Sequence, residues 1–439
     1  MEDSKILGKQ LIEYCEKGDI EKVKELVSKG VPASFTYIEE GTWGAYDETG
    51  ALHSAIQYFS KQPKESKSLD LIQFLLEHGA NVNSEIGNAN WKGSGSRTSA
   101  FQMVCNISLE DDDADLLKLF LKYNGDPNKE KRSESHTMRT DGRYISYPIH
   151  RAVDSSKPKC LLALLEAGAN VNALRTERVN NERGYNQNLS ESPINIACSK
   201  STETFIPEEN LDEWTENKID RNIEEEIEKI KKENNQLINK EKLIEELEIK
   251  KKLEKIKKLE EINKSKKINW ENNCKVIEIL LKHNADLNIV SKWNEHEYDE
   301  TKQQGDDPRD EDYESGITLV KVSKIPLHIA MEKKDKKLLW LLMKYGAKDQ
   351  DLDYKGSKVN CKSILQDLKD KGCSIEEIQD IEDVYNLKWT PRIHKILPVP
   401  LKKAIESIFY CLKKKSKGYK KELAFLVFND LQSIWDITK

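Results

Sequence analysis

The sequence lacks long apolar runs, closely spaced cysteine pairs and a large excess of either charge. No stretch of its 439 residues approaches the roughly 18–20 consecutive apolar residues that a membrane-spanning helix requires. The first ten residues also lack the apolar run of a secretion signal. The formal net charge of -6 provides no global positive field for nucleic acid. We therefore expect a cytoplasmic protein, with the nucleus as an open alternative, that neither inserts into a membrane nor binds nucleic acid.

The usual marks of a catalytic or metal site are missing as well. The eight cysteines are scattered without a CxxC pair, whereas a disulfide framework or a zinc knuckle shows tighter, repeated spacing. There is no glycine loop followed by Lys-Ser/Thr, no GxSxG, no HExxH and no kinase signature. The sequence therefore predicts reduced, buried thiols, no catalytic or metal-ligating residues, no cofactor and no enzymatic activity.

A short phrase recurs along the chain, and each copy follows an apolar helix-like stretch. In one such stretch the apolar residues 71, 72, 75 and 76 have helical spacing and form a single stripe. The glycine that opens most copies suits the left-handed residue that ends a helix. Because a lone helix pair cannot bury its stripe, the copies must stack into one continuous core. The copies are GANVN at 79–83, NGDPN at 124–128, GANVN at 168–172, NADLN at 284–288 and GAKDQ at 346–350.

A second phrase opens each unit: GALHSA at 50–55, SAFQMV at 99–104, YPIHRA at 147–152, SPINIA at 192–197 and IPLHIA at 325–330. With both phrases the chain resembles ankyrin repeats, whose signature is a TPLHxA opening and a GAdvN close. The resemblance implies an all-α solenoid of about six helix-turn-helix units over residues 1–351. The units are expected near 5–34, 50–83, 99–128, 147–172, 192–288 and 325–350.

The resemblance also assigns a structural role to the fourth residue of the opening phrase. His53, His150 and His328 match the signature histidine, which in the family bonds the backbone and joins neighbouring repeats. Gln102 and Asn195 replace this histidine in two copies, which fits a hydrogen-bonding role better than a chemical one.

The segments between one unit and the next are longer than a repeat period of about 33 residues allows. They measure 16, 19, 20 and 37 residues, counted from positions 83 to 99, 128 to 147, 172 to 192 and 288 to 325. We expect elongated finger loops whose aromatic and arginine side chains bind a protein partner, since Trp, Tyr and Arg supply most hot-spot energy. The alternative is that these aromatics pack on one another as small local cores. The predicted partner-binding residues are Trp43, Tyr46, Trp91, Arg143, Tyr144, Tyr185, Trp293 and Tyr298, and Arg97 lies in the same segments.

A charged insertion, residues 205–270, interrupts the fifth full unit. Its central part, 221–267, consists almost entirely of Lys, Glu, Ile, Leu and Asn, with apolar residues at three-to-four spacing that predict a helix. Whether it forms one helix, a hairpin or a disordered segment stays open. It could be a partner-binding coiled coil, but the slipping heptad favours a solvated helical spur.

The C-terminal segment, residues 352–439, is expected to be helical. Residues 362–387 fit one or two short helices that cap the array, and a proline-rich connector precedes two amphipathic helices. This last part resembles the F-box and SOCS-box motifs of ubiquitin-ligase adaptors, which implies docking on a ligase subunit. The alternative is a helical cap that closes the solenoid. The residues that match the box pattern are Leu397, Pro398, Leu401, Ile405 and Phe409.

Three hypotheses about function follow from these patterns. The first is a non-enzymatic scaffold or adaptor that binds a protein partner through its finger loops and concave face. The second is a substrate-recognition adaptor of a cullin-type ubiquitin ligase, docked through residues 389–435. The third is a structural protein in which residues 221–267 join a larger assembly.

Overall fold

The computed structural model of the chain describes residues 2–41, 45–89, 95–136, 140–181, 186–200, 212–233, 237–298, 317–354 and 357–386. These residues form two compact units. Unit 1 comprises the described parts of Met1–Ser199, Val276–Ile329 and Leu342–Gly372. Unit 2 comprises the described parts of Lys200–Lys275, Ala330–Leu341 and Cys373–Lys439.

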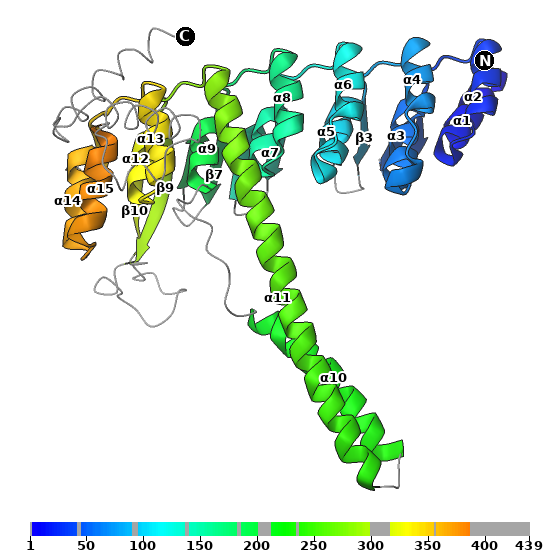
Figure 1. Ribbon diagram of the computed structural model, residues 1–439. Helices are drawn as coiled ribbons and strands as arrows, with labels where there is room; N and C mark the ends of the chain where they lie inside the picture. The colour runs from blue at the N-terminus through cyan, green and yellow to red at the C-terminus, as the bar shows by residue number, and fades with distance from the viewer. Residues whose placement is uncertain are drawn as a thin grey trace, which may run out of the picture. The chain divides into compact units, whose positions relative to one another are not determined.

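Unit 1 is built from pairs of short helices that stand side by side, as the blue to green part of Figure 1 shows. The first helices of successive pairs, α1, α3, α5 and α7, contact one another in that order. The pairs are α1 (Glu2–Lys17) with α2 (Ile20–Ser28), α3 (Ala51–Lys61) with α4 (Asp70–Glu77), α5 (Ala100–Asp111) with α6 (Asp115–Lys122), and α7 (Pro148–Asp154) with α8 (Pro158–Glu166). The remaining α-helices of the described residues, counted over both units, are α9 (Pro193–Lys200), α10 (Glu213–Glu233), α11 (Leu237–Lys282), α12 (Pro326–Glu332), α13 (Lys336–Lys344), α14 (Cys361–Asp370) and α15 (Ile375–Tyr385).

The apolar stripes of the second helices form the core together with apolar residues of the first helices. A left-handed residue ends each second helix. All four apolar residues of the stripe on α4, Leu71, Ile72, Leu75 and Leu76, are buried. The left-handed position is confirmed in all five copies of the closing phrase, either as glycine or as asparagine. It is held by Gly79, Gly168 and Gly346, with φ of 89°, 89° and 85°, and by Asn124 and Asn284, with φ of 65° and 60°.

Of the two copies that begin with asparagine, NGDPN carries a glycine one residue later, for a steric reason. A Cβ atom on Gly125 would lie 2.7 Å from the ring of Phe101, a fully buried side chain. Asn124 can take the left-handed conformation because its short polar side chain tolerates it, whereas no side chain fits at Gly125.

The expected all-α ankyrin-repeat solenoid is wrong, because the fingers are antiparallel β-hairpins rather than loops. They form a four-stranded sheet in the order β1-β2-β3-β4 and a six-stranded sheet in the order β10-β9-β8-β7-β6-β5. The first contains β1 (Thr36–Glu40), β2 (Tyr46–Gly50), β3 (Glu85–Ala89) and β4 (Gly95–Ser99). The second contains β5 (Lys131–His136), β6 (Thr140–Ser146), β7 (Arg175–Asn181), β8 (Asn186–Glu191), β9 (Ser291–Tyr298) and β10 (Ile317–Lys324). The chain therefore has a mixed α/β fold.

The fingers form strands rather than loops because their backbone groups need hydrogen-bond partners. A finger of 16 or more residues carries many N–H and C=O groups that need partners. Each finger satisfies many of them by folding into a hairpin. Stacking brings neighbouring hairpins within strand distance, so that β2 pairs with β3, β6 with β7, and β8 with β9. The segment after residue 351, expected to be helical, also begins with a small hairpin of β11 (Leu352–Tyr354) and β12 (Ser357–Val359).

The final asparagine of the first four closing phrases links its unit to the next one. Asn128 Nδ2 donates to the carbonyl of Gly168 at 2.9 Å, and Asn170 N donates to Asn128 Oδ1 at 2.7 Å. The same contact recurs from Asn83 to Asp126 N, from Asn172 to Asp286 N and from Asn288 to Lys348 N. These repeated bonds hold the closing turns of unit 1 in register.

In unit 2 the charged insertion forms two separate helices, α10 and α11. Ile219, Ile223 and Leu247 are buried, and Lys255 pairs with both Glu216 and Asp220 at 2.7 Å. Other apolar residues of the insertion are more than half exposed, namely Ile249, Leu253 and Ile256. No helix among the described residues combines the length and apolarity needed to cross a bilayer.

Removing the Asn128 side chain tests the links between units. We expect Asn128→Ala to lower the free energy of unfolding by about 1–2 kcal/mol, because two hydrogen bonds are lost. Urea unfolding of the full chain measures this change, with Asn222→Ala on an exposed part of α10 as the matched control. If both variants unfold at the wild-type urea concentration, Asn128 does not link the units.

Candidate functional site

The signature histidines of α3 and α7 attach the first helix of a unit to the base of the following hairpin. His53 Nε2 lies 3.1 Å from the carbonyl oxygen of Ser84, directly before β3, and His150 Nε2 lies 2.9 Å from that of Ala173, just before β7. A carbonyl oxygen can only accept, so Nε2 carries the proton in both rings. Both side chains are buried. The two histidines therefore position the hairpins that begin with β3 and β7.

The two replacements of the signature histidine behave differently from each other. Asn195, on α9, donates through Nδ2 to the carbonyl of Ile289 at 3.1 Å and to Ser291 Oγ at 2.6 Å, at the base of β9. Gln102, on α5, instead turns back to its own helix, where it accepts from Ser99 N and completes a capping box. Asn195 thus reproduces the histidine contact, whereas Gln102 does not.

Burial keeps His53 and His150 uncharged near neutral pH. It lowers the pKa of His53 from 6.5 to about 4, although the hydrogen bond to Ser84 opposes the shift. Burial likewise lowers the pKa of His150 to about 4, against the hydrogen bond to Ala173. Neutral rings of this kind serve as fixed hydrogen-bond donors near neutral pH.

The register of the six-stranded sheet places two predicted binding residues in one cross-strand row. Tyr144 on β6 pairs with Glu177 on β7, Glu177 with Leu189 on β8, and Leu189 with Trp293 on β9. Direct partners in antiparallel strands project from the same face. All four residues of this row are half-buried. We call Tyr144, Glu177, Leu189 and Trp293 the aromatic row.

The aromatic row lies on the face of the sheet that is covered at the base of the strands. Ser146 and Ser291, each two residues from a row member along its own strand, are buried. Trp293 also has the ammonium of Lys324 over its ring, 5.6 Å from the ring centre. The row is therefore an amphipathic strip whose ends are aromatic and whose middle holds one carboxylate.

Arg143, also predicted to bind a partner, is exposed on the opposite face of the sheet from Tyr144. It is the cross-strand partner of Arg178, which is also exposed. Tyr46 lies in the four-stranded sheet, on β2, and Arg97 on β4 forms ion pairs with Glu48 and Glu85. Of the predicted residues whose side chains the structure describes, Tyr144 and Trp293 share one face of the six-stranded sheet.

The other predicted site residues cannot be placed in the site. Tyr298 is the last residue of β9, but its side chain is not among those that the structure describes. Trp43, Trp91 and Tyr185 fall outside the described residues, as do the box-like residues Leu397, Pro398, Leu401, Ile405 and Phe409.

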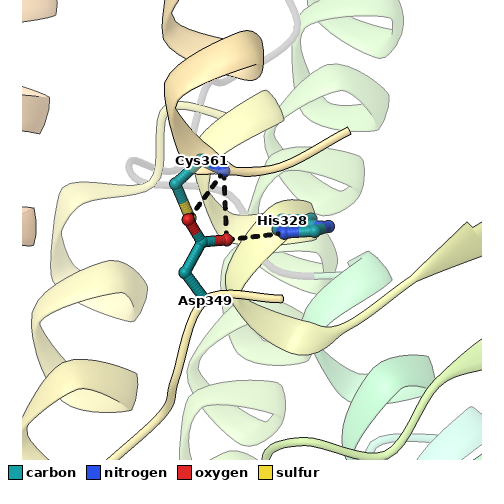
Figure 2. Close-up of side chains that lie close together, drawn as sticks. All are labelled: His328, Asp349 and Cys361. Atoms are coloured by element: carbon teal, nitrogen blue, oxygen red, sulfur yellow. Dashed lines mark hydrogen bonds and ion pairs between the residues drawn. The ribbon is translucent and has the colours of Figure 1, made fainter. Parts of the chain in front are cut away.

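His328, the third signature histidine, belongs to a different arrangement (Figure 2). Its Nε2 lies 3.1 Å from Asp349 Oδ1, and both Asp349 oxygens accept from the backbone N–H of Cys361, at 3.1 and 3.2 Å. Burial raises the pKa of Asp349, but hydrogen bonds from Cys361 and His328 outweigh it and leave the pKa below its ordinary value. Among the described residues, these three form the one group of His, Cys and acidic side chains whose ligand atoms could surround a metal ion.

Sequence reasoning missed this cluster because its members follow no fixed motif. His328 comes from an opening phrase and Asp349 from a closing phrase, but Cys361 lies beyond the last repeated phrase. The sequence feature that could have indicated the cluster is GAKDQ, in which aspartate and glutamine replace the usual final residues of the closing phrase.

Comparison with protein families gives no matching family model, and comparison with curated proteins gives no matching relative. The function is therefore inferred from the residues and their geometry.

The buried histidines make the stability of the fold depend on pH. Because their folded-state pKa lies below the unfolded value, the unfolded chain binds more protons between about pH 6.5 and 4, and stability falls as pH is lowered through this window. Asparagine at position 150 keeps a donor, as Asn195 does, but cannot titrate. Between pH 6.5 and 4.5 we expect His150→Asn to lose about 2 kcal/mol less stability than the wild type.

Urea unfolding at several pH values measures this difference. The double variant His53→Asn/His150→Asn should flatten the pH dependence further. Identical pH dependence in all three proteins would contradict the assigned role of the buried rings.

Proposed function

We propose that the chain is a non-enzymatic scaffold that binds a protein partner through the aromatic row of its six-stranded sheet. The observation that carries the proposal is the row itself: Tyr144 and Trp293 come from different fingers, yet the strand register places them on one face. Three strand spacings separate them, or about 14 Å. That span suits a contact with a segment of another protein.

The chemistry of the row supports protein recognition. Tyrosine and tryptophan bury large areas while fixing few torsions, and they dominate the energy of many interfaces. Leu189 adds apolar surface between them, and Glu177 adds a carboxylate that a basic group of a partner can approach. We infer a partner segment with two apolar side chains and a basic residue between them.

The sheet also reduces the cost of binding. Each row member sits on a strand paired on both sides, so its backbone is already ordered before a partner arrives. The free energy lost in ordering the backbone on binding is therefore smaller than it would be for an unpaired finger loop.

Capture experiments with the full chain test this function. We expect the double variant Tyr144→Ala/Trp293→Ala to retain at least about tenfold less of the main partner from native lysate, since hot-spot truncations cost about 2 kcal/mol or more. Glu177→Lys should weaken capture of the same partner. Arg178→Ala, next to Glu177 but on the opposite face, is the matched control and should capture as the wild type does.

Circular dichroism checks that each variant keeps its fold. Equal capture by wild type and the double variant would show that the partner binds elsewhere, and a loss of capture in Arg178→Ala alone would assign binding to the other face.

A further inference from the structure

We propose that His328, Asp349 and Cys361 form a binding site for a zinc-class divalent metal ion. Their ligand atoms, Nε2, a carboxylate oxygen and Sγ, all lie within 4.8 Å of one another. The Nε2–Oδ1 distance of 3.1 Å is close to the edge length of a tetrahedron around zinc, which is about 3.3 Å for metal–ligand bonds near 2.0–2.1 Å. His328 and Asp349 therefore need only small movements to bind one metal ion.

The fold supplies the three ligands from separate elements. His328 projects from α12, Asp349 from the turn after α13, and Cys361 is the first residue of α14 (Figure 2). His328 and Cys361 are completely buried, whereas the Asp349 side chain is 25% exposed. An ion can thus enter on the Asp349 side, where a water molecule completes the coordination.

This histidine differs from the other signature histidines in what it faces. His53 and His150 each donate to a backbone carbonyl, which serves to join two elements. His328 meets a carboxylate and a thiol instead, and an imidazole, a carboxylate and a thiolate together make a ligand set for zinc. Thiolate and imidazole favour Zn²⁺ or Co²⁺ over Mg²⁺ and Ca²⁺, which prefer oxygen ligands.

Metal binding must displace two protons from the ligand atoms. The carboxylate accepts from Nε2 of His328, so this nitrogen carries the imidazole proton before the metal binds. When the ion binds, the thiol proton of Cys361 leaves to solvent, and the imidazole proton moves by way of solvent from Nε2 to Nδ1. One proton is released per metal ion. Nδ1 is buried and has no hydrogen-bond partner among the described residues, so its protonation weakens binding relative to a closed structural zinc site.

Titration of the full, chelator-treated chain with Co²⁺ tests the site. We expect one Co²⁺ per chain, a near-ultraviolet thiolate-to-cobalt charge-transfer band, and loss of that band when Zn²⁺ is added. Absence of the band in the wild-type chain overturns the proposal.

Two variants and one control assign the band to these residues. The single variant Cys361→Ser should abolish the band. Cys361→Ser and Asp349→Asn should each weaken Zn²⁺ binding by at least about tenfold. Cys373→Ser, which changes a half-buried cysteine outside the cluster, should bind as the wild type does. A band that persists in Cys361→Ser assigns the metal to another thiol and overturns the proposal.

The same set of variants distinguishes a loss of metal binding from a loss of folding or of partner binding. Circular dichroism identifies a variant that fails to fold, in which case the wild-type titration and Asp349→Asn decide. The Tyr144→Ala/Trp293→Ala protein should bind Co²⁺ as the wild type does, so failure of the proposed scaffold function leaves the metal test unaffected.

Discussion

A hydrogen bond from a buried polar side chain on a first helix to the base of the next finger is the contact on which the finger sheets depend. His53, His150 and Asn195 each make this bond to backbone beside β3, β7 or β9. The bond of His150 is buried and those of His53 and Asn195 are partly buried, so leaving the carbonyl unpaired would cost free energy. The helices thereby fix where each hairpin begins, and hairpins that begin at equivalent points can pair edge to edge.

The boundary between the two sheets lies where this hydrogen bond to the next finger is missing. Gln102, on α5, bonds Ser99 N on its own helix rather than the following finger. The next finger begins with β5, and this strand is at the edge of the six-stranded sheet, while β4 is at the edge of the four-stranded one. The asparagine contacts continue across this boundary from Asn83 to Asp126 N, so the closing turns stay in register while the sheet is interrupted.

The sequence was sufficient for the local features and insufficient for the sheets. The stripe on α4 and the left-handed closing residues depend on neighbours a few positions away, so spacing and residue type predict them. Strand pairing depends on contacts between distant residues: Leu189 and Trp293 lie on either side of the charged insertion, yet they are partners. The sequence predicts partner contacts for both Arg143 and Tyr144, but adjacent residues of a strand face opposite ways. The metal-capable cluster was missed because Cys361 follows the last phrase at no characteristic spacing.

Pairing of β8 with β9 is the central claim, because it joins fingers from either side of the insertion and places Trp293 in the aromatic row. Disulfide trapping tests it directly in the full-length double variant Ser190→Cys/Lys292→Cys, at positions that are cross-strand partners. Their Cα atoms should be about 4.5–5.5 Å apart, within the range that a disulfide spans. Under mild oxidation we expect mass spectrometry to find residues 190 and 292 linked, and no link in Ser190→Cys/Trp293→Cys, whose side chains lie on opposite faces. Thiols that stay reduced at 190 and 292 would contradict the pairing of these fingers.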